Sequence, residues 1–135
     1  MAEKVLTGMA GVYAVAAELS LRGFVVAVTS RNAPGVDLLA ASPGLQKTVS
    51  LQVKANKPKG TQAYWLLGKR AQTDIAPSLF YVFVNLKDGG NRAEFYIVPS
   101  AVVARGLVVE ERPNSTWYSF ARNERYRDRW EQLIG

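Results

Sequence analysis

A strand, a tight turn and a second strand within residues 34–59 constrain the fold of this 135-residue chain most strongly. In the second strand apolar and polar residues alternate, with Val49, Leu51, Val53 and Ala55 on one face and Ser50, Gln52 and Lys54 on the other. This period of two is typical of a β-strand that buries one face. Ser42-Pro43-Gly44 suits a type II turn, in which glycine supplies a positive φ. The segment therefore predicts a β-hairpin whose first strand, residues 36–41, carries Asp37.

The rest of the chain predicts a helix first, then strands, then helices. Helical spacing of apolar residues before Gly23 indicates a helix over residues 7–22. Strands are expected at 24–29, 79–86 and 94–98, a short helix from Pro99, an irregular segment at 107–121 and a closing helix over 122–134. Residues 62–72 fit either a helical turn or a short strand. This order predicts one domain spanning residues 1–135, an α/β sandwich around a mixed sheet.

Composition narrows both the chemistry and the partner. The chain has no histidine and no cysteine, so a metal would have to be held by oxygen atoms. Its formal charge is +6, and no acidic residue lies between Asp37 and Asp74, a span that holds several lysines. Such a local positive field favours a polyanionic partner. With no apolar run expected to cross a membrane and no signal-peptide pattern, the chain is expected to be cytoplasmic.

Three polar residues of the hairpin form a candidate site. Gln52 and Lys54 are two apart on one strand and so share a face, and strand pairing can bring Asp37 beside them. Carboxylate, amide and backbone carbonyl oxygens suit a hard cation such as Mg²⁺ or Mn²⁺. A metal held in this way can polarise a phosphate, and a neighbouring lysine can stabilise the charge that builds up in the transition state.

This pattern resembles the PD-(D/E)XK nuclease superfamily, in its Asp…Gln-x-Lys variant, which is similar to Mrr-type endonucleases. The resemblance implies a restriction-endonuclease-like three-layer sandwich, a central mixed sheet flanked by helices, and a Mg²⁺- or Mn²⁺-dependent endonuclease acting on DNA. It implies that Asp37, Gln52, the Val53 carbonyl and Glu18 hold the metal, and that Lys54 orients the attacking water. Val36 stands where the proline of the motif would be, and Gln52 replaces an acid. By the helix pattern alone, Glu18 is a surface ion pair with Arg22.

Further basic residues are expected to grip the DNA backbone, and the fold could also serve other functions. The candidates are Lys57 and Lys59 in a basic loop and the pair Lys69-Arg70. The protein could act as a homodimer or with a separate recognition subunit. Two alternatives remain open: an inactive nucleic-acid-binding module in which Gln52 marks a decayed site, and a protein-interaction subunit that uses the aromatic C-terminal part.

Overall fold

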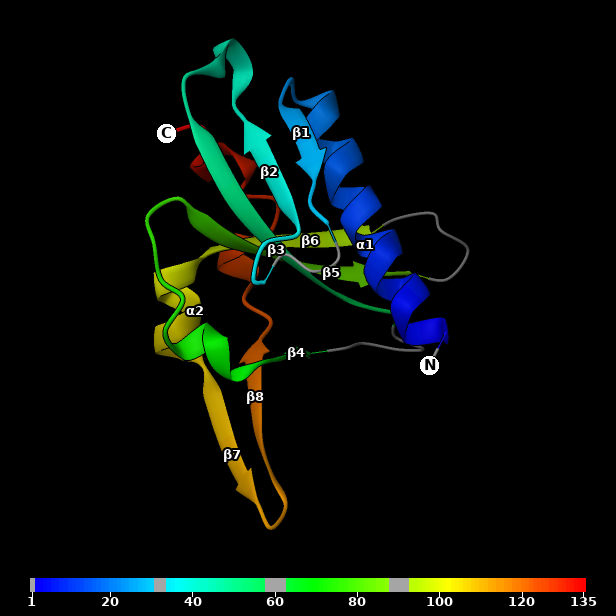
Figure 1. The fold of residues 1–135 in the computed structure, drawn as a ribbon, viewed down its shortest axis with the longest axis vertical. Coiled ribbons are helices and arrows are strands. Elements are labelled where there is room, and N and C mark those ends of the chain that lie inside the picture. The colour runs from blue at the N-terminus through cyan, green and yellow to red at the C-terminus, as the bar shows by residue number, and fades with distance from the viewer. Residues whose placement is uncertain (1, 31–33, 58–62, 88–92) are drawn as a thin grey trace.

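The computed structural model describes residues 2–30, 34–57, 63–87 and 93–135 (Figure 1). Two helices and eight strands follow one another in the described part of the chain. They are α1 (Ala2–Leu21), β1 (Val25–Val28), β2 (Leu38–Ala41), β3 (Thr48–Asn56), β4 (Tyr64–Leu67), β5 (Leu79–Leu86), β6 (Ala93–Pro99), α2 (Ser100–Gly106), β7 (Val108–Arg112) and β8 (Ser115–Ala121). Short 3₁₀ turns follow β2, β4 and β8.

Strand β3 lies at the centre of a five-stranded sheet with the order β1-β2-β3-β5-β6. The β3–β5 pair is parallel, whereas the other three pairs are antiparallel. Every described side chain of β5 from Phe80 to Asn85 is buried, as expected for a strand that is covered on both faces. The predicted mixed sheet is therefore confirmed.

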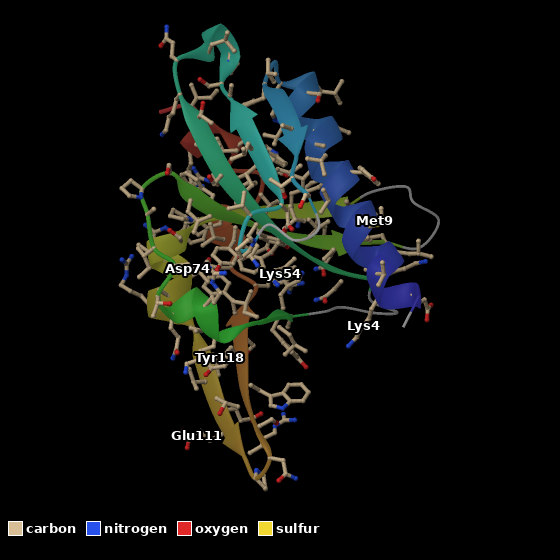
Figure 2. The ribbon with its side chains drawn as sticks, in the orientation of Figure 1. Lys4, Met9, Lys54, Asp74, Glu111 and Tyr118 are labelled. Carbon is tan, nitrogen blue, oxygen red and sulfur yellow. The ribbon has the colours of Figure 1, made fainter. Side chains whose placement is uncertain are left out.

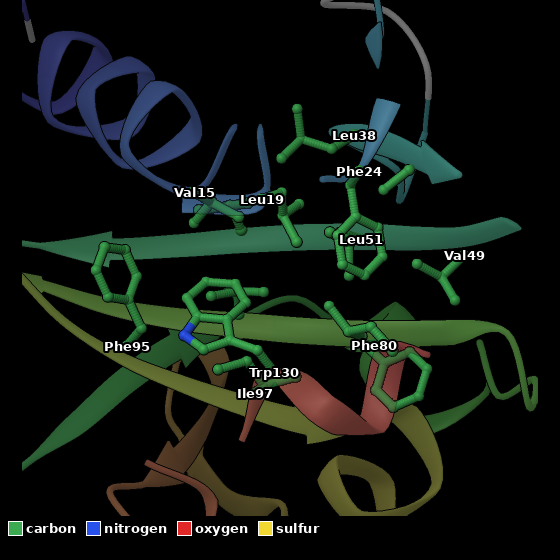
Figure 3. Packing of buried hydrophobic residues seen from close by; sticks show 14 of the residues in the cluster. Val15, Leu19, Phe24, Leu38, Val49, Leu51, Phe80, Phe95, Ile97 and Trp130 are labelled. Atoms are coloured by element: carbon green, nitrogen blue, oxygen red, sulfur yellow. The ribbon is translucent and has the colours of Figure 1, made fainter. Parts of the chain in front are cut away.

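Helix α1 covers one face of this sheet and packs on a core of aliphatic and aromatic side chains (Figure 3). Val15 and Leu19 are fully buried against Leu38, Leu51 and other residues of the central strands. Gly11 lies where the helix crosses β3, and a Cβ atom there would stand only 2.5 Å from the Cβ of Ala55. The absence of a side chain at this position lets the helix approach the strand closely.

The second face of the sheet carries aromatic residues and is covered by a second, three-stranded sheet with the order β4-β8-β7. The rings of Phe83 and Phe120 stack with their centroids 5.1 Å apart, and Trp65 lies 5.2 Å from Phe83. The indole nitrogen of Trp65 donates a hydrogen bond of 3.0 Å to the carbonyl of Val84. Helix α2 adds Val103 to this cluster. The predicted α/β sandwich is confirmed, with strands as well as a helix forming the layer on this face.

The hairpin turn is as predicted. The backbone N–H of Leu45 donates to the carbonyl of Ser42 at 2.7 Å, which closes the turn. Gly44 has φ 80° and ψ 4°, the values that the third residue of a type II turn requires. Local sequence chemistry therefore sets the reversal between β2 and β3.

Two predictions about the C-terminal part were wrong. Residues 107–121 form the β7–β8 hairpin, because alternating β-branched and aromatic residues favour strands on either side of Pro113-Asn114. Residues 122–134 form two 3₁₀ turns instead of a helix. Asp128 has a positive φ of 54°, and its N–H donates to the carbonyl of Phe95. Trp130 and Leu133 are nevertheless buried, because one 3₁₀ turn also places residues three apart on one side.

Helix α1 also departs from the sequence expectation in its length. It begins at Ala2 rather than at residue 7. By length and composition alone, Glu3–Leu21 reaches what a membrane-spanning helix needs, a test that core helices of soluble proteins and signal sequences also pass. In the structure this helix packs on the sheet through Val15 and Leu19.

Candidate active site

Asp37 stands just before β2, at the point where β2 and β3 stop pairing regularly. Leu38 pairs with Leu51 in the ladder, but the N–H of Asp37 donates to the carbonyl of the same Leu51, at 2.8 Å. The Asp37 carboxylate then accepts the N–H of Val53 through Oδ2, also at 2.8 Å. The side chain thus replaces a backbone partner and is fixed to the strand that carries Gln52 and Lys54.

The backbone on both sides of Asp37 is held by its neighbours. Thr29 donates its N–H to the carbonyl of Asp37 at 3.0 Å and its hydroxyl to the carbonyl of Val36 at 2.6 Å. Gly35 has φ 73°, and a Cβ atom there would lie 3.4 Å from Oδ2 of Asp74. A side chain at Gly35 would therefore be strained by the positive φ and would lie in van der Waals contact with Asp74. These contacts preorganise the segment that presents the carboxylate.

Gln52 and Lys54 project from β3 on the face opposite Val53. In the parallel ladder they lie beside Tyr81 and Phe83, and both are half-buried. Burial raises the pKa of the Tyr81 hydroxyl, with a further contribution from the charge of Asp74. The predicted sharing of one face by Gln52 and Lys54 is in accord with this register.

Two hollows flank this part of β3. The Asp37 hollow, of about 540 Å³, lies between Asp37, Val53 and the residues Lys4, Met9 and Tyr13 of α1. The Lys54 hollow, of about 690 Å³, is lined by Lys54 and Lys57, by Glu3, Lys4 and Thr7 of α1, and by Asn56, Tyr64 and Leu66. Lys4, which lies near the start of α1 (Figure 2), lines both hollows.

Glu18 lies elsewhere. Its carboxylate forms an ion pair of 2.6 Å with Arg22, and that guanidinium lies 4.7 Å from the centre of the Trp130 ring. Glu18 is five residues beyond Tyr13, or about 7.5 Å further along the helix axis. The structure therefore joins Asp37, just before β2, to Val53 of β3, with Gln52 and Lys54 as the flanking residues on that strand, and it does not bring Glu18 to them.

The oxygen atoms at Asp37 suit a hard cation. Among the described residues, Oδ1 of Asp37 accepts no hydrogen bond, and no three acidic side chains gather into a metal cluster. Asp37 would supply the carboxylate, Gln52 an amide oxygen and Val53 a carbonyl oxygen. Mg²⁺ keeps several waters and often takes only one or two protein carboxylates together with substrate phosphates. These three oxygen donors therefore suit Mg²⁺ when a substrate phosphate supplies a further ligand.

The predicted DNA-binding cations have different surroundings. Lys57 lines the Lys54 hollow, and Lys69 is exposed at the start of a 3₁₀ turn. The guanidinium of Arg70 forms an ion pair of 2.8 Å with Asp74. Lys59 lies outside the described residues.

The sequence prediction missed several residues around the hollows. Glu3, Lys4 and Thr7 escaped because the helix was expected to begin at residue 7. Residues 3, 4, 7 and 8 are spaced about one helical turn apart, which would have indicated that they share one side of the helix. Tyr64 was missed because residues 62–72 fitted either a helical turn or a short strand. Its carbonyl accepts the side-chain amide of Asn56 at 2.8 Å, which holds β4 against the end of β3.

Comparison with known proteins identifies a likeness in fold. No family model matches the chain, and no curated protein matches it in sequence. The solved structure of a bacterial homing endonuclease, I-Ssp6803I, superposes with a TM-score of 0.62 at 14% identity. The match covers 96% of this chain and 89% of the other. The chain therefore has the fold of a homing endonuclease.

Proposed function

We propose that this protein is a metal-dependent DNA endonuclease with an active site of the PD-(D/E)XK type. One observation carries the proposal: the Asp37 carboxylate is hydrogen-bonded to Val53, between Gln52 and Lys54 on the same strand. The likeness in fold to a homing endonuclease supports it. The lysines that line the Lys54 hollow provide the positive charge that a phosphodiester backbone requires.

Each residue has a defined part in the proposed reaction. Asp37, Gln52 and the Val53 carbonyl would hold Mg²⁺ or Mn²⁺. When bound, such an ion supplies Lewis-acid polarisation of the phosphate and lowers the pKa of a bound water. Lys54 donates hydrogen bonds to the phosphate and to the attacking water, and its positive charge stabilises the developing charge. Lys4 and Lys57 hold the adjacent phosphates through charge alone.

The test is plasmid cleavage with Mg²⁺ or Mn²⁺ by the unchanged protein and by Asp37→Asn and Lys54→Gln. Asparagine keeps an oxygen that can accept the Val53 N–H, so the fold should persist while the metal-binding charge is lost. We expect each variant to lose cleavage by at least about 100-fold, which corresponds to about 2.7 kcal/mol of lost transition-state stabilisation.

Glu18→Gln is the matched control, since it makes the same chemical change at an acid that the structure pairs with Arg22. It should cleave within about twofold of the unchanged protein, because an exposed ion pair contributes at most about 1 kcal/mol to stability and none to catalysis here. Full activity of Asp37→Asn, or equal losses in the Glu18 and Asp37 variants, would reject the site.

A second candidate is a DNA-binding module without catalysis, which the neutral amide at Gln52 favours. Such a module would bind DNA in a salt-sensitive manner and leave plasmid intact at every divalent ion concentration. A Gln52→Glu variant that gained cleavage would identify a decayed site. Cleavage by the unchanged protein that disappears in Asp37→Asn would exclude this candidate.

A further inference from the structure

The three-stranded sheet β4-β8-β7 has one face in the core and one open face. Trp65 and Phe120 face each other across the β4–β8 ladder, and both are buried in the aromatic cluster. Tyr64 and Leu66, on either side of Trp65, point the other way, and each is 47% exposed. The open face therefore belongs to a sheet whose opposite face packs into the aromatic core.

This open face continues onto the β7–β8 hairpin, which extends away from the five-stranded sheet (Figure 1). The ladder pairs Ser115 with Arg112 and Trp117 with Glu110, on the same side as Tyr64 and Leu66. The Arg112 guanidinium lies 3.9 Å from the centre of the Trp117 ring and donates to Glu110 through Nε at 2.9 Å. Together with Tyr64 and Leu66 these residues line a shallow hollow of about 240 Å³. We refer to this surface as the ribbon face.

The ribbon face is continuous with the candidate active site. Tyr64 and Leu66 line both the ribbon hollow and the Lys54 hollow. One surface therefore leads from the lysine proposed to act on the phosphate to the tip of the hairpin. A partner held at Lys54 would meet the ribbon face next.

We propose that the β7–β8 hairpin enters a groove of the DNA that flanks the phosphate at Lys54, and reads base edges there. This inference rests on the proposed function and names how that site selects its substrate. A two-stranded ribbon fits the major groove of B-DNA. Glu110 accepts from both Nε and Nη2 of Arg112, so entry into the groove would exchange this ion pair for base edges, with Arg112 donating to guanine and Glu110 accepting from cytosine. Stacking on Trp117 holds the Arg112 fork in a defined plane, and Ser115 and Ser119 add small hydroxyls beside it.

The test is selection of the duplexes that the protein binds from a random-sequence pool, with no divalent ion added so that the DNA is not cleaved. The affinity of the protein for the recovered sequence is then measured. We expect the unchanged protein to recover a preferred sequence. Arg112→Gln should bind it about tenfold more weakly and lose the preference at one position, because a bidentate base contact is removed. Trp117→Ala should weaken that same position by letting the guanidinium move.

Arg105→Gln and Val109→Ala are the matched controls. Arg105 is an exposed arginine on α2, and Val109 lies on the opposite side of the same hairpin. Both variants should keep the preferred sequence and bind it within about twofold of the unchanged protein. Circular dichroism should give the same spectrum for all four variants, so that a loss of binding is not a loss of fold.

The outcomes separate this inference from the proposed function. A pool recovered without sequence preference, or Arg112→Gln with unchanged affinity and preference, overturns the inference while cleavage dependent on Asp37 would still stand. A change in molecular mass by light scattering with unchanged DNA binding would assign the ribbon face to a second copy of the chain. If the hairpin variants lose the preference but no protein cleaves DNA, the inference stands and the nuclease proposal fails. Absence of DNA binding by the unchanged protein overturns both.

Discussion

The two halves of α1 lie on the same sheet but serve different purposes. In the C-terminal half Val15 and Leu19 are fully buried, and Glu18 pairs with Arg22, the residue that directly follows the helix. In the N-terminal half Leu6 is 64% exposed, and Lys4 lines both hollows. Among the described residues, Lys4 forms no ion pair. Gly11 separates these halves at the closest approach to β3.

The difference between the two halves shows which charged side chains already have a partner within the protein. Arg22 pairs with Glu18, lies over the ring of Trp130 and lines neither the Asp37 hollow nor the Lys54 hollow. Lys4 lines the Asp37 hollow and, with Glu3 and Lys54, the Lys54 hollow, so both lysines face open space that an anion could enter. Charges that lack a partner within the fold are the better guide to a binding site on this helix.

The largest contrast should come from truncating a leucine in each half. Leu19→Ala removes a fully buried side chain from the core under α1 and should lower the free energy of unfolding by about 2–5 kcal/mol. Leu6→Ala changes an exposed side chain and should stay within about 0.5 kcal/mol of the unchanged protein. Urea denaturation followed by circular dichroism measures both. Similar losses in the two variants would mean that the N-terminal half is packed in solution as firmly as the C-terminal half.

A smaller contrast is expected between two glycines of α1. Gly11→Ala places a methyl group 2.5 Å from the Cβ of Ala55 and should destabilise the fold by about 1–3 kcal/mol through overpacking. Gly8→Ala meets no atom within 4 Å and should stabilise the helix by about 0.5–1 kcal/mol. The melting temperatures of the two variants show directly whether each substitution stabilises or destabilises the fold. If Gly11→Ala were stabilising, the close crossing of α1 over β3 would be wrong.

The smallest effects on stability should accompany removal of one positive charge from each half. Lys4→Gln should leave stability unchanged but weaken DNA binding and reduce the slope of log affinity against log salt by about 0.9. Arg22→Gln should cost about 1 kcal/mol of stability, from its exposed ion pair and its contact with Trp130, and leave the salt slope intact. Fluorescence anisotropy of a labelled duplex across a salt series distinguishes them. A larger change in slope for Arg22→Gln would reverse the assignment of the two halves.

Much of the strand core could be predicted from sequence, because its signals are local. The alternation from Val49 to Ala55 fixed the faces of β3, and Pro43-Gly44 fixed the turn. The prediction failed at 122–134, where a spacing of three to four residues fits a helix and a pair of 3₁₀ turns equally well. It also missed the β7–β8 hairpin, because neither strand is buried on its own and only pairing between them stabilises both.

The sequence by itself determined the hairpin that carries Gln52 and Lys54 on its second strand and has Asp37 at the start of its first, and that oxygen atoms are the available metal ligands. Only the tertiary structure decided that Asp37 bonds to Val53, that Glu18 is paired with Arg22, and that Lys4 lines both hollows. The physical reason is the range of the interactions. Strand periodicity and turn chemistry act over a few residues, whereas the end of a ladder and the crossing of a helix depend on packing between residues far apart in the chain.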